Sequence, residues 1–162
     1  MLPLKIKPYL INVYEEVDDS YSIIEGELSC CGKQEFEITY DGLVKKSILM
    51  GTYLCSDDNK LVLEARCKRC GRKILIFNSS IDGFSNCEKT PDRSVSRLKS
   101  FDCKKCNKNN YTVKIKYEYS DIHELIEEGI ENIDNAYSWI WVSLKCNKCN
   151  SEYRKLIDFE TA

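Results

Sequence analysis

Three C-x-x-C pairs constrain the fold of this chain more than any other feature of its sequence. They read CKRC, CKKC and CNKC. The chain has ten cysteines in all: Cys30, Cys31, Cys55, Cys67, Cys70, Cys87, Cys103, Cys106, Cys146 and Cys149. Two thiolates three positions apart can hold one metal ion from a tight turn, and two such turns complete a tetrahedral site. The pattern therefore predicts metal sites, provided that the cysteines stay reduced.

The start of the chain bears on the redox compartment. MLPLKIKPYLINVYEE contains no apolar run long enough for a secretory signal. No stretch of the chain approaches the ~20 apolar residues that a membrane span needs. We therefore expect a cytoplasmic protein without a membrane partner, in a compartment where thiols stay reduced and disulfides are rare. The formal net charge of -2 argues against a globally cationic nucleic-acid binder.

An offset comparison divides most of the cysteines between two copies of one unit. Phe36 follows Cys31 by five positions, as Tyr111 follows Cys106, and a β-branched residue lies two positions further on in both places. CKRCGRKILIF likewise matches CNKCNSEYRKLIDF in the cysteine turn and in the apolar segment beyond it. Each copy thus has an early and a late cysteine turn. The second copy has a complete ligand set: Cys103, Cys106, Cys146 and Cys149.

The first copy departs from this pattern at its early turn, where Ser29-Cys30-Cys31-Gly32 stands in place of C-x-x-C-G. Either both vicinal cysteines bind the metal, or one binds and Cys55, Cys87 or water fills the gap. A vicinal site needs a tight, non-extended turn, with Gly32 free to take positive φ. Cys55 and Cys87 are otherwise interpreted as small apolar residues or free thiols. The vicinal interpretation uses these ligands: Cys30, Cys31, Cys67 and Cys70.

Hydrophobic periodicity predicts strands around the cysteine turns. Residues 111–119 alternate apolar and polar side chains, as residues 36–40 do, and residues 139–146 are apolar on both faces of an expected central strand. Residues 121–129 have helical periodicity and predict one short helix ending near Gly129. The lone histidine, His123, lies in this acidic segment and is expected to be solvated.

This arrangement resembles the zinc ribbon family, in which two C-x-x-C turns flank a three-stranded antiparallel sheet. The resemblance covers nearly the whole chain, once per half. It implies a mainly β fold with a small α contribution, built from two tandem units with three or more antiparallel strands each. The units are expected at 1–82 and 97–162, with a linker at 83–96 and the helical insert near 121–129.

The resemblance also implies a cofactor, Zn²⁺, with two ions per chain expected and one at minimum. Four cysteines close the coordination shell, whereas a catalytic zinc keeps an open position. The sequence also lacks a P-loop, a G-x-S-x-G motif and an H-E-x-x-H motif. We therefore expect no enzyme and no small-molecule substrate. The implied metal ligands are Cys30, Cys31, Cys67, Cys70, Cys103, Cys106, Cys146 and Cys149.

Two kinds of partner remain. A basic segment, 95–116, interleaves lysines with aromatic residues, as a surface for stacked bases would. Lysines in cysteine turns also balance the negative charge of a zinc held by thiolates. Acidic segments at 15–27 and 118–134 separate the charges, which favours oriented protein association.

The preferred interpretation is therefore a protein-binding module, of a regulatory or immunity type. Nucleic-acid binding is the alternative. Its candidate contacts are Lys99, Lys104, Lys105, Lys108 and Tyr111.

Overall fold

The computed structural model describes residues 1–86 and 98–161, which form a mainly β protein. The strands are β1 (Leu10–Val17), β2 (Tyr21–Leu28), β3 (Phe36–Asp41), β4 (Leu43–Ser47), β5 (Gly51–Cys55), β6 (Val62–Cys67), β7 (Lys73–Asn78), β8 (Lys99–Ser100), β9 (Tyr111–Ser120), β10 (Trp139–Cys146) and β11 (Glu152–Glu160). The helical elements are η1 (Lys7–Tyr9), η2 (Phe84–Asn86), α1 (Ile122–Glu127) and η3 (Ile133–Asn135). The mainly β class with a small α contribution is confirmed.

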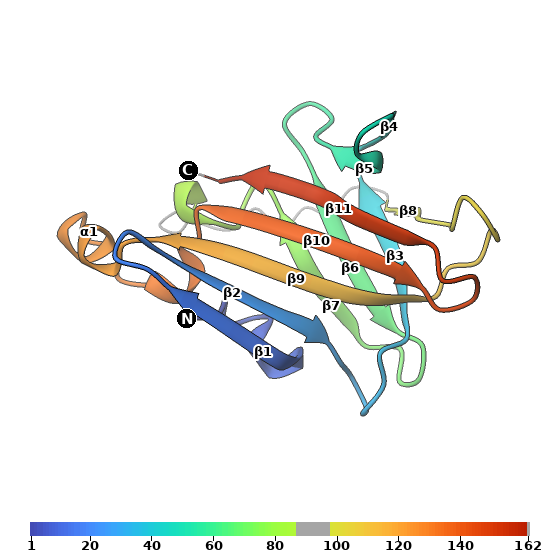
Figure 1. The fold of residues 1–162 in the computed structure, drawn as a ribbon, viewed down its shortest axis with the longest axis horizontal. Helices are drawn as coiled ribbons and strands as arrows, with labels where there is room; N and C mark the ends of the chain where they lie inside the picture. Colours follow the sequence, from blue (N-terminus) through green and yellow to red (C-terminus); the bar gives the residue numbers. More distant parts are fainter. Residues whose placement is uncertain (87–97, 162) are drawn as a thin grey trace.

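Strand β9 lies at the centre of one large antiparallel sheet (Figure 1). It pairs with β2 along one edge and with β10 along the other, and β1 and β11 extend the sheet outward. Strand β3 reaches β9 through one pair, Phe36 with Tyr111, and continues the sheet into β6 and β7. Strands from both halves of the chain are therefore interleaved in a single sheet.

The two tandem units that the sequence predicts are not clearly separate in this topology. Strand β2 of the first half pairs with β9 of the second half over residues 21–27. Apolar residues of both halves belong to one common core inside the curled sheet. The boundaries at 82 and 97 stay a prediction. Residues 87–96 of the expected linker lie outside the described residues.

Each half nonetheless contains the same three-stranded arrangement in the same register. In β3-β6-β7, Phe36 pairs with Cys67, and in β9-β10-β11, Tyr111 pairs with Cys146. Across the late turns, Arg66 pairs with Lys73 in the first half and Lys145 pairs with Glu152 in the second. The register thus supports the internal repeat. Because Phe36 and Tyr111 also pair with each other, equivalent positions of the two copies meet on antiparallel strands.

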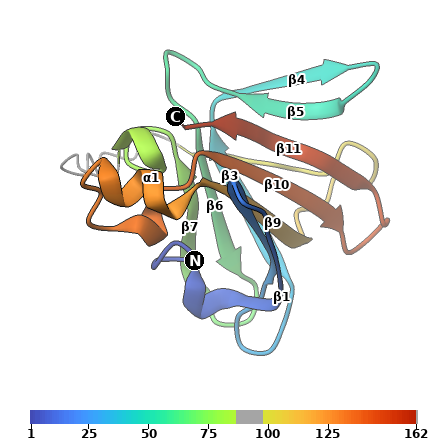
Figure 2. The same ribbon diagram turned by 60° about the vertical axis from the view of Figure 1, so that its left-hand side comes forward.

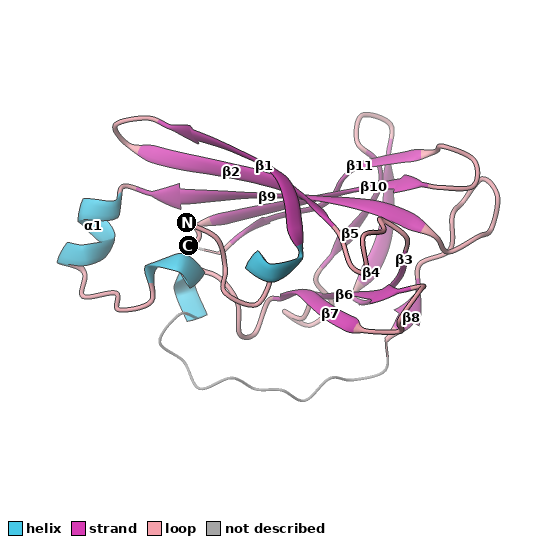
Figure 3. Cartoon of the chain, turned by 90° about the horizontal axis from the view of Figure 1, so that it is seen from below, coloured by secondary structure: helices cyan, strands magenta, loops and turns pink. Residues whose placement is uncertain are grey.

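The core lies between the two arms of the curled sheet. Figure 2 shows the sheet bending so that β6 and β7 lie across β9 and β10, and Figure 3 shows the two layers from below. The inward side chains of β9 at 111, 113, 115, 117 and 119 are all 0% exposed. Aromatic rings join the layers, with centroids 5.0 Å apart for Phe77 and Phe159.

Two inserts decorate this sheet. The hairpin β4-β5 forms its own two-stranded sheet and packs over β11, with Leu54 buried beneath it (Figure 2). The helix expected near 121–129 is confirmed as α1, which Asp121 caps and whose chain turns away at Gly129 with φ 77°. In the described part of the chain, no helix has the length and apolar character needed to cross a membrane.

Candidate metal centres

The three C-x-x-C turns share one backbone geometry. In each, the first cysteine donates its N–H to the carbonyl five residues later and accepts from the N–H four residues later. The residue after the second cysteine takes positive φ, which glycine and asparagine tolerate better than other residues. These residues are Gly71 (77°), Asn107 (61°) and Asn150 (62°). The conformation brings both thiols of each pair to the same side of a tight turn.

Each turn also directs a backbone amide at its second sulfur. The N–H two residues further on hydrogen-bonds the thiol in all three turns and acts to lower its pKa. The pairs are Cys70 with Arg72, Cys106 with Lys108, and Cys149 with Ser151. An amide donor stabilises a thiolate more than a thiol, so each of these hydrogen bonds favours the negative form of the sulfur that accepts it.

The second cluster joins two such turns. Cys103 and Cys106 precede β9, and Cys146 and Cys149 lie on the β10–β11 turn. Their four Sγ atoms all lie within 4.8 Å of one another. The Cys103–Cys149 sulfurs are 3.5 Å apart and the Cys106–Cys146 sulfurs 3.6 Å apart. Cys103 and Cys146 are buried, so this cluster reaches into the core.

Hydroxyl groups support the sulfurs of the second cluster. Tyr153 donates from its hydroxyl to Cys103 Sγ at 3.4 Å and accepts from the Lys104 N–H at 2.8 Å. Burial acts to raise the pKa of Cys103, but hydrogen bonds from Tyr153 and from the turn amides lower it to about 6. Ser151 Oγ lies 3.1 Å from Cys149 Sγ, and this hydrogen bond lowers the pKa of Cys149. Burial raises the pKa of Cys106 to about 12.

The early turn of the first cluster is a tight two-residue turn, as a vicinal site requires. Cys30 and Lys33 exchange two backbone hydrogen bonds of 3.0 Å around it. Both central residues have positive φ, 56° at Cys31 and 68° at Gly32, which is the pattern of a type I′ turn. Gly32 was expected to adopt such a conformation, whereas nothing in the sequence indicates it for Cys31. The turn rotates the two neighbouring sulfurs to within 3.9 Å of each other.

This turn completes the first cluster. The sulfurs of Cys30, Cys31, Cys67 and Cys70 all lie within 4.8 Å of one another, with Cys30 and Cys70 3.6 Å apart. Burial raises the pKa of Cys30 to about 12, while the Arg72 N–H and the neighbouring thiols lower the pKa of Cys70 to about 7.

The first cluster also has a more open setting than the second. Cys31 and Cys70 are exposed. They border a hollow of about 460 Å³ that Tyr9 and Arg72 also line.

The sulfur spacing fits one tetrahedral ion per cluster. Four sulfurs at about 2.3 Å from a tetrahedral zinc lie about 3.8 Å from one another. The short sulfur–sulfur separations, 3.5 to 3.9 Å, agree with that value. A disulfide has its sulfurs about 2.05 Å apart, and these cysteines are free. Cys55 belongs to neither cluster, and Cys87 lies outside the described residues.

The candidate nucleic-acid contacts divide into exposed lysines and a buried tyrosine. Lys99, Lys104, Lys105 and Lys108 are exposed near the early turn of the second cluster. Tyr111 is 0% exposed and donates from its hydroxyl to the Phe101 carbonyl at 2.8 Å, and Phe101 is itself buried. The interpretation of these rings as a stacking surface is therefore corrected, because both belong to the core beneath the cluster.

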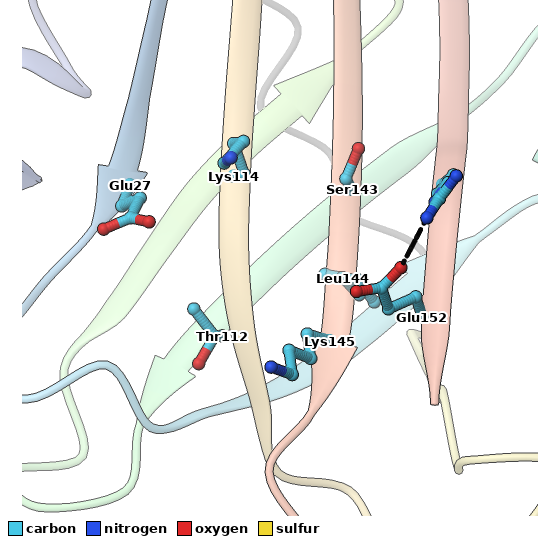
Figure 4. A pocket seen from close by; sticks show the side chains of 8 residues that line it. Glu27, Thr112, Lys114, Ser143, Leu144, Lys145 and Glu152 are labelled. Carbon is cyan, nitrogen blue, oxygen red and sulfur yellow. Dashed lines mark hydrogen bonds and ion pairs between the residues drawn. The ribbon is translucent and has the colours of Figure 1, made fainter. Parts of the chain in front are cut away.

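Other titratable groups do not gather into a third cysteine or histidine cluster among residues 1–86 and 98–161. His123 is exposed on α1, as expected. A hollow of about 360 Å³ lies on the outer face of β9, β10 and β11 (Figure 4). Its lining mixes both signs of charge, and Arg154 pairs with Glu152 at 3.1 Å. The hollow presents no patch of a single charge.

No family model, curated protein or solved structure matches the chain. Its function is therefore inferred from the two clusters and the surfaces around them.

Proposed function

We propose that this protein is a non-enzymatic, cytoplasmic zinc-binding module of the zinc ribbon type that binds a protein partner. The observation that carries the metal assignment is the gathering of eight thiols into two four-sulfur groups with tetrahedral spacing. The two groups occupy equivalent positions of two three-stranded arrangements with one register. All-sulfur ligand sets favour zinc among the divalent ions of the cell.

Both sites are proposed to be structural. Four thiolates complete the coordination of a tetrahedral zinc and leave no open position for a substrate or an activated water. A bound zinc supplies a cross-link between turns. At the first site, that cross-link joins the β2–β3 connection to the β6–β7 turn, and at the second, the segment before β9 to the β10–β11 turn. Amide and hydroxyl donors, with the lysines nearby, offset the negative charge of the sulfurs.

An exposed edge strand supports the protein-binding part of the proposal. Strand β1 pairs with β2 along one side and is the last strand of the sheet at that edge. Its exposed apolar side chains include Tyr14 (63% exposed) and Val17 (71% exposed). Edge strands with apolar side chains pair readily with a strand from another protein. This surface fits a partner that adds an extended segment to the sheet.

Nucleic-acid binding is the second candidate, because exposed lysines surround both clusters. Titration with a panel of DNA and RNA oligonucleotides at two salt concentrations separates the candidates. Phosphate contacts release counterions, so a nucleic-acid binder loses affinity steeply as salt rises. We expect the proposed protein-binding module to bind none of the oligonucleotides in this salt-dependent way. Steep salt-dependent binding would favour the alternative.

The metal assignment has a direct test. Native mass spectrometry of the reduced, purified chain gives the number of bound ions, and elemental analysis identifies them. We expect two zinc ions per chain. A metal-free chain, or one that holds iron, would contradict the proposal.

A further inference from the structure

The turn between β4 and β5 carries the most exposed large apolar side chains of the described residues. Ile48 is 105% exposed and Leu49 is 95% exposed, so solvent surrounds both side chains almost completely. Met50, next in the turn, is 44% exposed. Three consecutive exposed apolar side chains at one hairpin turn form a patch, unlike the single, scattered apolar residues of an ordinary protein surface. We name residues 48–50 the apolar tip.

The apolar tip is held in a formed turn. The Ser47 hydroxyl accepts hydrogen bonds from the backbone N–H groups of Leu49 at 3.2 Å and Met50 at 3.4 Å. Ser47 pairs with Gly51 at the base, and Gly51 has φ 67°, a conformation that glycine adopts without strain. Two amides of the tip are thus satisfied from within the turn. An element that enters an apolar medium needs its polar backbone groups satisfied in this way.

The hairpin that carries the tip is cationic. Residues 43–55 contain Lys45 and Lys46 and no acidic residue. Both lysines are exposed, and neighbouring strand residues point to opposite faces, so they flank the tip on two sides. Tyr53 pairs with Lys45 across the hairpin. Apolar residues at the end, with lysine and tyrosine behind them, match the order of layers at a bilayer surface.

We propose that the apolar tip inserts into the surface of an anionic lipid bilayer, with Lys45 and Lys46 against the lipid headgroups. A protein pocket would have to match the shape of Ile48 and Leu49, which solvent surrounds almost completely. A fluid bilayer needs no such match, and its anionic headgroups would attract the two lysines that lie behind the tip. The expectation of no membrane partner rests on the lack of a membrane-spanning segment. A tip that binds only at the bilayer surface does not need such a segment. This inference is independent of the zinc sites and of the protein partner.

Binding through one tip is expected to be weak and reversible. Three apolar side chains bury no more hydrocarbon than a single myristoyl chain, whose membrane association constant is about 10⁴ M⁻¹. The anionic lipid adds about fivefold per lysine near the surface. The protein is therefore expected to bind vesicles that contain anionic lipid and to bind neutral vesicles much less.

Sedimentation with vesicles tests the proposal. The full chain is mixed with vesicles of phosphatidylcholine and phosphatidylglycerol in equal parts, or with phosphatidylcholine alone. We expect the protein to sediment with the anionic vesicles and the double variant Ile48→Asp/Leu49→Asp to lose more than about tenfold in affinity. Lys45→Gln/Lys46→Gln should remove most of the preference for anionic lipid.

A matched control places the same two charges at exposed apolar positions elsewhere, in Ile122→Asp/Ile126→Asp on α1. These side chains are 43% and 57% exposed. The control should bind like the unchanged protein, and all variants should keep its melting temperature. If the unchanged protein stays in the supernatant with both vesicle types, the proposal is overturned, and a protein partner becomes the favoured occupant of the apolar tip. Equal binding by the Ile48→Asp/Leu49→Asp variant would also overturn it.

Discussion

The two cysteine clusters occupy equivalent places in one register, yet they are built from different turns. The second cluster has two C-x-x-C turns, whereas the first replaces its early one with the two-residue turn at Cys31 and Gly32. Both bring four sulfurs within 4.8 Å of one another. At their early turns, therefore, the two halves share the position of the sulfurs rather than the spacing of the cysteines along the chain.

The surroundings of the clusters differ as well. Tyr153, which supports Cys103 in the second cluster, has Ile74 as its counterpart in the first, since Tyr153 pairs with Leu144 and Ile74 pairs with Ala65 in the same register. Each cluster has two buried cysteines, but the other two are exposed in the first cluster (Cys31 and Cys70) and half-buried in the second (Cys106 and Cys149). The second site should therefore contribute more to stability than the first.

The largest effect is expected from Cys146→Ser. A structural zinc contributes on the order of 10 kcal/mol in small peptides, which rivals the whole stability of a domain. Because β9 pairs with β2, β3 and β10, loss of the second site should unfold both halves together. Circular dichroism should show no cooperative thermal transition. Cys55→Ser, outside both clusters, is the control and should keep two zinc ions; a Cys146→Ser variant that melts like the control would refute the assignment.

Cys30→Ser and Cys31→Ser should have the next largest effect. Each should leave one zinc ion per chain and lower the free energy of unfolding by an amount on the order of 4 kcal/mol, with a cooperative transition retained. Zinc stoichiometry by native mass spectrometry reads the outcome. If both variants lose one zinc ion, then Cys30 and Cys31 are both ligands, and the vicinal turn is functionally equivalent to a C-x-x-C turn. Loss in Cys31→Ser alone would show that Cys30 is not a ligand.

Tyr153→Phe should have a moderate effect confined to the second cluster. The variant removes the hydroxyl that donates to Cys103 Sγ and accepts from the Lys104 N–H. A buried group left without its partner costs about 1–3 kcal/mol, so the melting temperature should fall while two zinc ions remain. Tyr14→Phe, at a 63% exposed position, is the control. If both variants melt alike, the hydroxyl does not support the cluster.

The smallest effect is expected from Gly32→Ala. Gly32 has φ 68°, and an added Cβ would meet no atom within 4 Å, so only the backbone conformation opposes the change. The cost should be about 1 kcal/mol. Gly129→Ala is matched, with φ 77° and equally open space, but lies on the helical insert. In competition with a zinc chelator, Gly32→Ala should bind zinc more weakly than the unchanged protein, and Gly129→Ala should not. If the two variants retain zinc equally, the conformation at Gly32 does not support the first site.

Much of each cluster could be predicted from sequence because cysteine spacing reports on local turns. The offsets from Cys31 to Phe36 and from Cys106 to Tyr111 predict equivalent positions, and the structure gives both aromatic residues a late-turn cysteine as pairing partner. Positive φ at Gly32 was predictable from its residue type. At Cys31 it was not, because only the closure of the turn imposes it.

The merging of the two halves could not be predicted in the same way. Period-two alternation identifies β9 as a strand and assigns its faces, but it does not say which strand lies on each edge. Strands β1 and β2 precede the cysteines and have no counterpart in the repeat. In the sequence of β2, the apolar Ile24 and Leu28 alternate with the acidic Glu25 and Glu27, and Asp18-Asp19-Ser20 comes just before the strand. This is a hairpin signal that could have identified the two strands. The burial of Tyr111 likewise follows from tertiary packing.

X-ray absorption at the zinc edge tests the central claim most directly, because it counts the sulfurs around the metal in both clusters together. The protein should be measured with its full complement of zinc and under reducing conditions. The account predicts two zinc ions per chain and four sulfurs per zinc at about 2.3 Å, with no lighter ligand atom. A mean of about three and a half sulfurs, with an oxygen or nitrogen completing the shell, would show that one site lacks a thiolate and would contradict the equivalence of the two clusters.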